Sequence, residues 1–536
     1  MKNPSSSTNI ESEFSQTAAS AGMIGLAAFA GSFIGFFLQL LVAFYFGASN
    51  QTDAYFMALS TSELLSKLLL GGSITAVFLP MFVNRLAQGQ SQQAWQMALN
   101  LLHLTFLAFI VLLSILVIFA SPFISFISPG FDSSTHELTT RLLLVLLPSF
   151  ALLYLVELTT AMLQALHHFL IPSLLRIVSP CVSIIAILML VKFVGIYALA
   201  VGVVVGSFIQ LGILLTALHR QGFSYHFVFQ PFDPAIKKLL YLTYPFLLSV
   251  LVTQGAGITY RILVSDLAPG SLAAIKFAEK ITQLLTIIFL NSVTMVIYPI
   301  MSTKAARHDM IGMRDTISSS IRLIFFVTMP IITGVALLRL PIVSFIYQRG
   351  SFSATDAALT SVALLFLVIG LTTNGISSVL GHATLALQET RAAVAVTIAS
   401  QAIAISLFVL LVPKLAHAGL ALASSLVPLA IALLYFLYLT RFIPHLSVIF
   451  YHATYTKTAI LALVMGILVF LVSPWSTLVT DHQQISLFLQ ILLPSIIGAT
   501  FFLVGAYLWR IPELIQLLKL FRTRWSKLST IFHRPS

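Results

Sequence analysis

Two groups of charged residues interrupt otherwise apolar stretches of this sequence. Glu63 and Lys67 are four residues apart, which is the spacing and order of an intrahelical ion pair, and Asp53 lies nearly four helical turns before Lys67. The second group has a similar arrangement and consists of Lys276, Glu279 and Lys280. Because ionisable side chains are costly in a membrane and are usually retained there for function, both groups are candidate functional sites.

The elements that position these residues must be membrane-spanning helices. Of the 536 residues 59% are apolar and 8% are charged, and the mean hydropathy is +1.02, which exceeds what a water-soluble domain of this length tolerates. Charge-poor runs long enough to cross a bilayer are centred near residues 33, 68, 108, 147, 183, 206, 251, 287, 327, 369, 401, 428, 466 and 497. We therefore predict an all-α integral membrane protein with about fourteen transmembrane helices.

An internal repeat organises these spans. Residues 72–80 return as residues 291–299, displaced by 219 positions, and the same displacement relates residues 122–127 to 341–346. Each repeat contains six spans, and because six is even, both repeats enter the membrane from the same side. We therefore expect two parallel six-helix repeats followed by two further helices. The predicted segments are a disordered cytoplasmic tail (1–19), an N-terminal lobe of six spans (20–218), a cytoplasmic linker (219–240), a C-terminal lobe of six spans (241–441), two further spans (442–509) and a basic amphipathic cytoplasmic tail (510–536).

The two charged groups fall in the second and eighth spans, which are partners in this repeat. We expect their charged faces to converge on the axis between the lobes, where they could form a binding cavity. The alternative is that they form salt bridges that only hold the two lobes together. His103, a single histidine within the third span, is expected to hydrogen-bond a neighbouring helix.

The distribution of basic residues predicts the orientation. With both termini in the cytoplasm, the inside segments hold 19 Lys and Arg residues and the outside loops hold six. The net charge of +12 is then a topology signal and an attraction to anionic lipid, and we expect no nucleic-acid partner. Cys181 is the only cysteine, so neither an internal disulfide nor a cysteine metal site is expected. We also predict that the protein has no cofactor and no metal and that it is a monomer.

Six segments of the sequence have the pattern of one known family: 46–58, those ending at Pro80 and Pro299, 128–131, 347–356 and 417–424. Together they resemble the MviN/MurJ lipid II flippase family of the multidrug/oligosaccharidyl-lipid/polysaccharide exporter superfamily. The resemblance implies a fourteen-helix flippase of the bacterial cytoplasmic membrane. Such a protein moves the undecaprenyl-pyrophosphate-linked peptidoglycan precursor, lipid II, from the inner to the outer leaflet by alternating access.

A substrate with a pyrophosphate group requires cations in the cavity, so the resemblance gives the charged residues a role. Arg261 and Lys280 match cationic positions of the family, and Asp53 matches its acid. The predicted substrate-binding residues are Lys67, Lys280, Lys276, Arg261 and Asp53, and the predicted supporting or coupling residues are Glu63, Glu279 and Glu157. Glu157 stands alone in the fourth span, where it could bind a coupling cation or proton or bond a neighbouring hydroxyl.

The sequence departs from the family at Ser32, Leu38 and Ser66, where members carry arginine. Arginine grips a phosphate in a bidentate fork, whereas lysine acts as a point charge. Lipid II is therefore the first choice of substrate. There are two alternative functions: a flippase for another polyprenyl-linked oligosaccharide of the exopolysaccharide or O-antigen type, and a cation-coupled multidrug exporter. An enzyme is not expected, because the outside loops hold only scattered acids and no phosphate-binding loop of the P-loop type is present.

Overall fold

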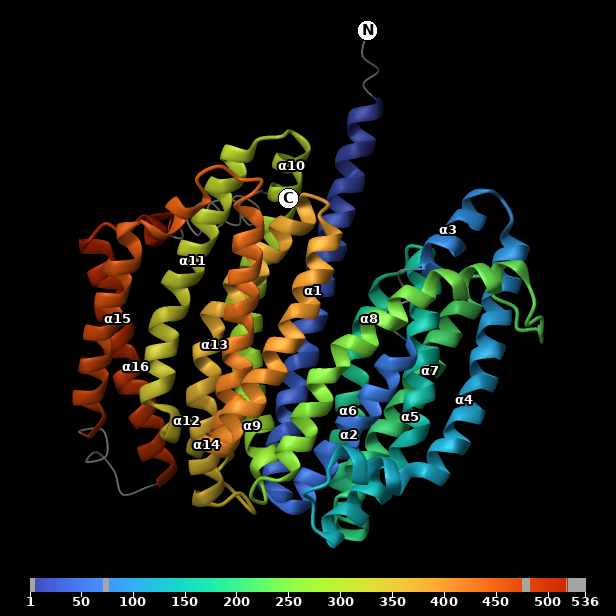
Figure 1. Ribbon diagram of the computed structural model, residues 1–536, viewed down its shortest axis with the longest axis horizontal. Coiled ribbons are helices and arrows are strands. Elements are labelled where there is room, and N and C mark those ends of the chain that lie inside the picture. Colours follow the sequence, from blue (N-terminus) through green and yellow to red (C-terminus); the bar gives the residue numbers. More distant parts are fainter. Residues whose placement is uncertain (1–4, 71–76, 475–482, 517, 519–536) are drawn as a thin grey trace, which may run out of the picture. The chain divides into compact units, whose positions relative to one another are not determined.

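The computed structural model describes residues 5–70, 77–474, 483–516 and 518, and within these ranges it contains helices and no strand (Figure 1). The first helices are α1 (Ser5–Phe46), α2 (Asn50–Leu70), α3 (Leu79–Ala87), α4 (Ser91–Ile127), α5 (Ser133–Ala165), α6 (Leu170–Val194), α7 (Tyr197–His219), α8 (Pro234–Ser265) and α9 (Ser271–Leu285). The later helices are α10 (Asn291–Ala306), α11 (Met310–Leu337), α12 (Arg339–Tyr347), α13 (Ala354–Ala386), α14 (Thr390–Leu439), α15 (Ala453–Val472) and α16 (Gln483–Leu508). The all-helical prediction is confirmed for these ranges.

Ten stretches of helix in the described part of the chain are long and apolar enough to cross a membrane. The protein is therefore a multi-pass membrane protein, as predicted. The predicted spans near residues 401 and 428 both lie in α14, which bends where Ala416 leaves the helical conformation (φ 51°, ψ −131°). The predicted spans near 68, 251 and 287 lie on α2, α8 and α9 to α10, which are not among the ten. In α2, three charged residues lower the hydropathy.

The chain divides into two compact units, residues 1–273 and 274–536. This division places α8 in unit 1, whereas the sequence analysis assigns it to the C-terminal lobe. The reason is that α8 packs against α2 and α4. The predicted boundary between the two lobes, near residue 240, therefore differs from the boundary between the two compact units, which lies after residue 273. The six-helix repeat that begins near residue 241 stays a prediction from the sequence.

Unit 1 is a bundle in which α6 packs against α1 and α7, and α5 against α2 and α7. Small residues allow α6 and α7 to approach closely. A Cβ atom on Gly202 would lie 2.7 Å from the Cα of Ser183, and one on Gly206 would lie 3.0 Å from the Cα of Ser179. Such close packing of small residues replaces the hydrophobic effect, which does not drive helices together in lipid.

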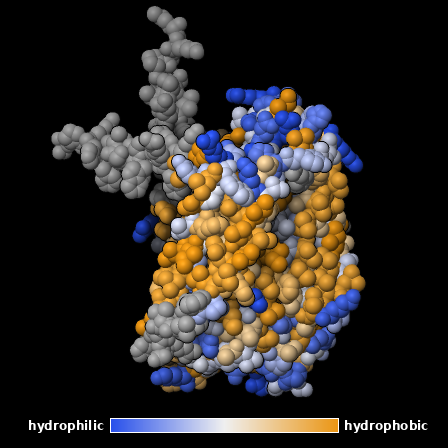
Figure 2. All heavy atoms as spheres, turned by 90° about the vertical axis from the view of Figure 1, so that its left-hand side faces the viewer, coloured by the Kyte–Doolittle hydropathy of each residue, from blue (hydrophilic) through white to orange (hydrophobic). Residues whose placement is uncertain are grey.

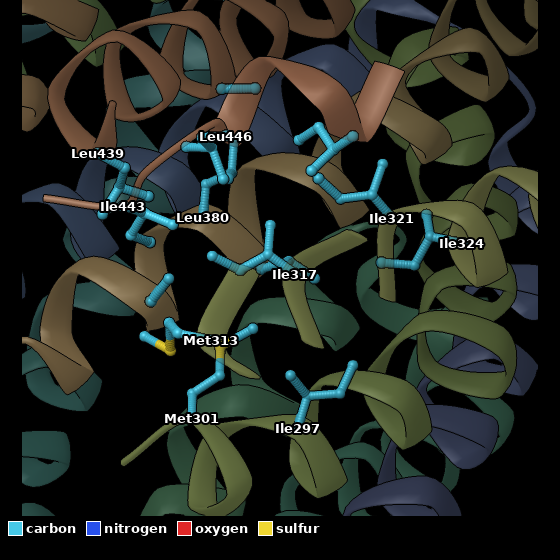
Figure 3. Packing of buried hydrophobic residues seen from close by; sticks show 14 of the residues in the cluster. Ile297, Met301, Met313, Ile317, Ile321, Ile324, Leu380, Leu439, Ile443 and Leu446 are labelled. Carbon is cyan, nitrogen blue, oxygen red and sulfur yellow. The ribbon is translucent and has the colours of Figure 1, made fainter. Parts of the chain in front are cut away.

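Unit 2 has its core around α11. Met313, Ile317, Ile321 and Ile324 recur at three- and four-residue spacing, so they lie on one face of this helix and are almost fully buried. Figure 3 shows their side chains packed with those of other segments of the unit, namely Ile297, Met301, Leu380, Leu439, Ile443 and Leu446. The helices α13 and α15 also pack on α11.

The outer face of unit 2 carries the signature of contact with lipid. Along α15 the exposed side chains Ile460, Leu463, Ile467 and Phe470 recur at three- and four-residue spacing and are between 51% and 67% exposed. Figure 2 views this side of the structure and shows a broad hydrophobic zone with hydrophilic residues above and below it. A face of this kind suits the hydrocarbon layer, because in water it would form a very large apolar patch.

Several predicted segments lie at the edges of the described ranges. The helix α1 begins at Ser5, inside the segment predicted as an N-terminal tail. Residues 72–76, which are five of the nine residues in the first copy of the repeat (72–80), lie outside the described residues. In the predicted C-terminal amphipathic tail, residues 512–516 are helical, and nearly all of the remainder lies outside the described residues. At its start, Ile511 and Leu514 are buried in a core cluster with residues of α15 and α16.

Candidate functional site

Asp53 lies in the first turn of α2 and is only 4% exposed. Its two carboxylate oxygens accept hydrogen bonds from the backbone N–H groups of Gly270 and Ala273, each at 2.7 Å. These donors belong to the start of α9, where backbone N–H groups have no partner within their own helix. Asp53 therefore caps α9 from a different helix, and its charge is used by the backbone of the protein itself.

Gly270 makes this contact possible. Its φ is +83°, a conformation that favours glycine, and a Cβ atom there would lie 2.2 Å from the carbonyl oxygen of Ala48. The turn between α8 and α9 is thus pressed against the chain just before α2. The family-like segment 128–131 also meets this region, because Gly130 donates its N–H to the hydroxyl of Ser265 at 3.1 Å.

Arg261 connects α8 to α2. Its Nη2 donates to the carbonyl oxygen of Ser60 at 2.7 Å and its Nε to the Ser60 hydroxyl at 3.3 Å, while Nη1 donates to the carbonyl oxygen of Gly257 at 2.8 Å. The side chain is partly exposed, and Glu63 is close enough to interact with its charge. Two of the predicted substrate-binding residues therefore link α2 to other segments: Asp53 joins it to the start of α9, and Arg261 joins it to α8.

Glu63 and Lys67 have exposed side chains on α2. Their spacing favours an ion pair, but the ion pairs found among residues 5–70, 77–474, 483–516 and 518 do not join these two residues. Lys67 lies in the last turn of α2.

On α9, the Nζ of Lys276 lies 2.7 Å from a carboxylate oxygen of Glu279, and the two side chains are 29% and 36% exposed. One turn on, Lys280 donates from its Nζ to the neutral amide oxygen of Gln283 at 3.1 Å. A three-residue separation on a helix allows the first of these contacts. Together the two lysines and one glutamate leave α9 with a net positive charge.

Phe277, also on α9, is fully buried. Its ring centroid lies 5.1 Å from that of Tyr347 and 5.4 Å from that of Phe352, and the Tyr347 hydroxyl donates to the carbonyl oxygen of Phe277 at 3.2 Å. Both partners belong to the family-like segment 347–356. The sequence analysis missed this aromatic contact between α9 and segment 347–356. The signal in the sequence was an aromatic residue, Phe277, between the charged residues Lys276 and Glu279, which indicates that α9 has a charged face and an apolar face.

The other predicted residues are simpler. The Glu157 side chain is exposed on α5. The hydroxyls of Ser32 and Ser66, two positions at which the sequence analysis expected the family to carry arginine, donate to carbonyl oxygens of their own helices, those of Ala28 at 2.9 Å and Ser62 at 3.0 Å. Within the part of the chain that the structure describes, no group of three or more His, Cys, Asp or Glu side chains is placed to hold a metal ion.

A bundle of apolar helices in which a few charged helices are held by polar contacts defines a multi-pass membrane protein. The fold is similar to that of a solved structure titled "Lipid II flippase MurJ, inward closed conformation", with a TM-score of 0.76 and 22% identity, covering 91% of this chain and 98% of that one. It is also similar to an inward-facing multidrug resistance MATE transporter, with a TM-score of 0.65 and 14% identity, over 77% of this chain and 95% of that one.

The sequence comparisons identify the family. The family model for the lipid II flippase MurJ matches residues 42–493, so this chain belongs to the lipid II flippase MurJ family. A probable lipid II flippase MurJ of Rhizobium tropici is 26% identical over 411 residues, 75% of this chain and 77% of its own length. The lipid II flippase MurJ of Thermosipho africanus is 25% identical over 423 residues, 79% of this chain and 85% of its own length. The predicted family is confirmed.

Proposed function

We propose that this protein moves lipid II, the undecaprenyl-pyrophosphate-linked cell-wall precursor, from the inner to the outer leaflet of the bacterial cytoplasmic membrane by alternating access. Family membership over residues 42–493 supports this class of activity. The observation that carries the assignment of a site is Lys280, a partly exposed cation whose hydrogen-bond partner is a neutral amide.

A lysine in this state suits an anionic ligand. None of the ion pairs in the described residues includes Lys280, so its charge is balanced by no acid at ion-pair distance. A pyrophosphate group would provide the missing negative charge. Because charged hydrogen bonds are stronger where water is scarce, such a contact would contribute strongly to binding.

The other charged residues take different parts in this proposal. Lys276 would exchange its contact with Glu279 for a phosphate oxygen, and Lys67 would supply a further cation from α2. Arg261 would hold α8 to α2, and the N–H groups of its guanidinium that are not used in this contact would donate to a phosphate oxygen. Asp53 would shape the site by capping α9, and Glu63 would balance the charge near Arg261.

The proposed topology has fourteen spans in two parallel six-helix repeats and two further helices. It adds to the ten candidate helices the spans on α2, α8 and α9 to α10, and it counts α14 as two spans that meet at Ala416. Both termini would lie in the cytoplasm, and the protein would work as a monomer without a nucleic-acid partner, a cofactor or a metal.

Glu157 is the proposed coupling residue. It is exposed on α5 next to buried apolar and hydroxyl side chains, and it is the carboxylate of the fourth predicted span. In this position it would bind a proton or a cation during the transport cycle, since the sequence offers no nucleotide-binding loop of the P-loop type.

A second candidate substrate is another polyprenyl-pyrophosphate-linked oligosaccharide. It is favoured by Ser32 and Ser66, whose hydroxyls are bonded to their own helices and supply no fork of phosphate donors. A multidrug exporter of the same superfamily is less favoured, because the lysines of α9 would repel cationic drugs.

The test is transport of lipid II by purified protein in vesicles. Lys280→Ala should lower the initial rate at least tenfold at equal abundance and unchanged thermal stability, and Lys280→Arg should restore part of it. Lys414→Ala is the matched control, because Lys414 is an exposed lysine beside the bend of α14. A normal rate for Lys280→Ala would remove Lys280 from the site.

The same vesicles decide between substrates. Lipid II, a polyprenyl-pyrophosphate oligosaccharide without a peptide and a cationic drug should be offered in parallel to the unchanged protein. We expect the highest rate for lipid II. A higher rate for the oligosaccharide would support the second candidate, and export of the drug alone would contradict both flippase proposals.

A further inference from the structure

The segment between α7 and α8 is held to α4 by polar contacts. The side-chain amide of Asn100 donates to the carbonyl oxygen of Gln230 and accepts from its backbone N–H, both at 2.8 Å. The ring of His103 contacts the carbonyl oxygen of Val228 through Nδ1 at 3.1 Å and the Tyr225 hydroxyl through Nε2 at 2.9 Å. The expectation that His103 bonds a neighbouring helix is therefore wrong, because its partners lie in this linker.

The same linker exposes aromatic rings. Tyr225 is 67% exposed, Phe227 72%, Phe229 47% and Phe232 79%. Along residues 225–229 the aromatic side chains alternate with His226 and Val228, and the rings of Phe227 and Phe229 are stacked with centroids 6.4 Å apart. Four exposed aromatic rings within eight residues indicate a binding surface.

The position of the linker along α4 identifies the apolar phase that it meets. About one turn beyond His103, α4 begins a series of exposed apolar side chains: Phe106, Leu107, Ile110 and Val111, which are between 46% and 54% exposed. One helical turn rises about 5 Å, so the contact of His103 with the linker lies at the level where α4 enters this apolar zone. Aromatic rings are enriched at that level of a membrane protein, the interface between hydrocarbon and headgroups.

The charges around the aromatic rings favour anionic lipids. Arg220, Lys237 and Lys238 are exposed near the two ends of the linker, and the Nζ of Lys237 lies 5.7 Å from the centre of the Phe232 ring. The acid in this segment, Asp233, already accepts the backbone N–H of Ala235 at 2.7 Å, where it caps α8. The segment therefore presents basic side chains beside aromatic ones, the combination that binds anionic headgroups.

We propose that residues 220–241 form an interfacial anchor, in which the aromatic rings enter the headgroup region of an anionic leaflet and the three basic residues contact its phosphates. Asn100 and His103 hold the anchor to α4. The inference rests on the membrane placement proposed above, but not on the identity of the transported substrate. Its partner is a lipid surface containing phosphatidylglycerol.

Depth measurements test the anchor in the full-length protein in lipid nanodiscs of phosphatidylcholine and phosphatidylglycerol. A bimane fluorophore is attached at Phe227→Cys or, as the matched control on the alternate side of the same segment, at His226→Cys, each in a Cys181→Ser background. Lipids brominated near the headgroup should quench the label at 227 several-fold more than at 226, and iodide in the water should show the reverse order. Strong iodide quenching at 227 would overturn the proposal, as expected if this surface awaits a protein partner.

Lipid selectivity tests the charges. Quenching of the label at 227 by spin-labelled phosphatidylglycerol and by spin-labelled phosphatidylcholine gives their relative association constants. We expect a preference for phosphatidylglycerol that falls on the order of tenfold in Lys237→Ala/Lys238→Ala, about fivefold or less for each lysine. Lys192→Ala, an exposed lysine at the end of α6, should leave the preference unchanged. Equal association of both lipids in the unchanged protein would contradict the anionic partner.

The readouts separate this proposal from the proposed transport function. Lys280→Ala should abolish lipid II transport and leave both quenching measurements unchanged. Failure of the unchanged protein to transport lipid II would not alter them either, whereas a water-exposed label at 227 would refute the anchor while transport continued.

Discussion

The helices α2 and α9 carry similar patterns of charge in the sequence but use them differently. On α2, Asp53 is buried and gives both carboxylate oxygens to the backbone of the segment that starts α9. On α9, Lys276 and Lys280 are partly exposed, and they donate hydrogen bonds to Glu279 and Gln283 on the same helix. The first arrangement fixes the backbone, and the second includes Lys280, a cation with a neutral partner that a ligand could reach.

The cost of burial, and not the spacing along a helix, separates a structural charge from one that is available to a ligand. A buried carboxylate must be fully hydrogen-bonded, so its removal leaves unpaired donors. A partly exposed lysine keeps water as an alternative partner, so its removal should cost little stability and should affect mainly ligand binding.

The largest effect on stability is expected for Asp53→Ala. It leaves the backbone N–H groups of Gly270 and Ala273 buried without their partner, which should cost about 3 kcal/mol of the free energy of unfolding. The measurement is thermal unfolding of the purified protein in detergent, together with its abundance in the membrane. Asp132→Ala is the control, because the Asp132 carboxylate also accepts backbone N–H groups but lies at the surface, and its loss should have a smaller effect. An unchanged melting temperature for Asp53→Ala would contradict the capping role.

A smaller loss is expected for Arg261→Lys. The lysine keeps the positive charge, but its three N–H donors share one nitrogen, so they cannot reach the acceptors on Ser60 and Gly257 that three separate guanidinium nitrogens reach. We expect a loss of about 1–2 kcal/mol in stability and a reduced rate of lipid II transport. Unfolding and transport should be measured on the same preparation. Normal stability with normal transport would show that only the charge of Arg261 matters.

For Glu279→Gln the stability should hardly change, by about 0.5 kcal/mol or less, because ion pairs that are partly exposed contribute little. Lys276 would then lack its acidic neighbour, and the apparent affinity for a polyprenyl-pyrophosphate ligand should rise. A binding titration with detergent-solubilised protein measures this change. A loss of stability comparable to that of Asp53→Ala would mean that the pair on α9 is structural.

The smallest effect on stability is expected for Glu63→Gln. Because the ion pairs of the described residues do not include Glu63 with Lys67, the free energy of unfolding should change by no more than about 0.5 kcal/mol. Thermal unfolding provides the measurement, with Glu63→Gln/Lys67→Ala as the companion variant. A clearly larger loss when Glu63→Gln is introduced into the unchanged protein, which disappears when Glu63→Gln is introduced into a Lys67→Ala background, would reveal an ion pair that forms in solution.

Part of the site was predictable from the sequence because it depends on neighbours along one helix. The contact of Lys276 with Glu279 is compatible with their three-residue separation. Lys280 lies one helical turn after Lys276, on the same side of α9, and is likewise partly exposed. The contact of Glu63 with Lys67 was expected on the same grounds and is not among the ion pairs of the described chain. Spacing makes such a contact possible on a helix, but exposed side chains have competing partners in water.

Composition and hydropathy by themselves determined that this is an all-helical membrane protein, since an apolar chain in lipid must satisfy its backbone within helices. The family motifs likewise identified the family that the comparisons confirm. Only the tertiary structure decided that Asp53 caps α9, that Arg261 joins α8 to α2, and that His103 holds the linker. These contacts link residues more than one hundred positions apart, and no local pattern specifies them, because they depend on which backbone donors and acceptors the packing of the helices leaves without a partner.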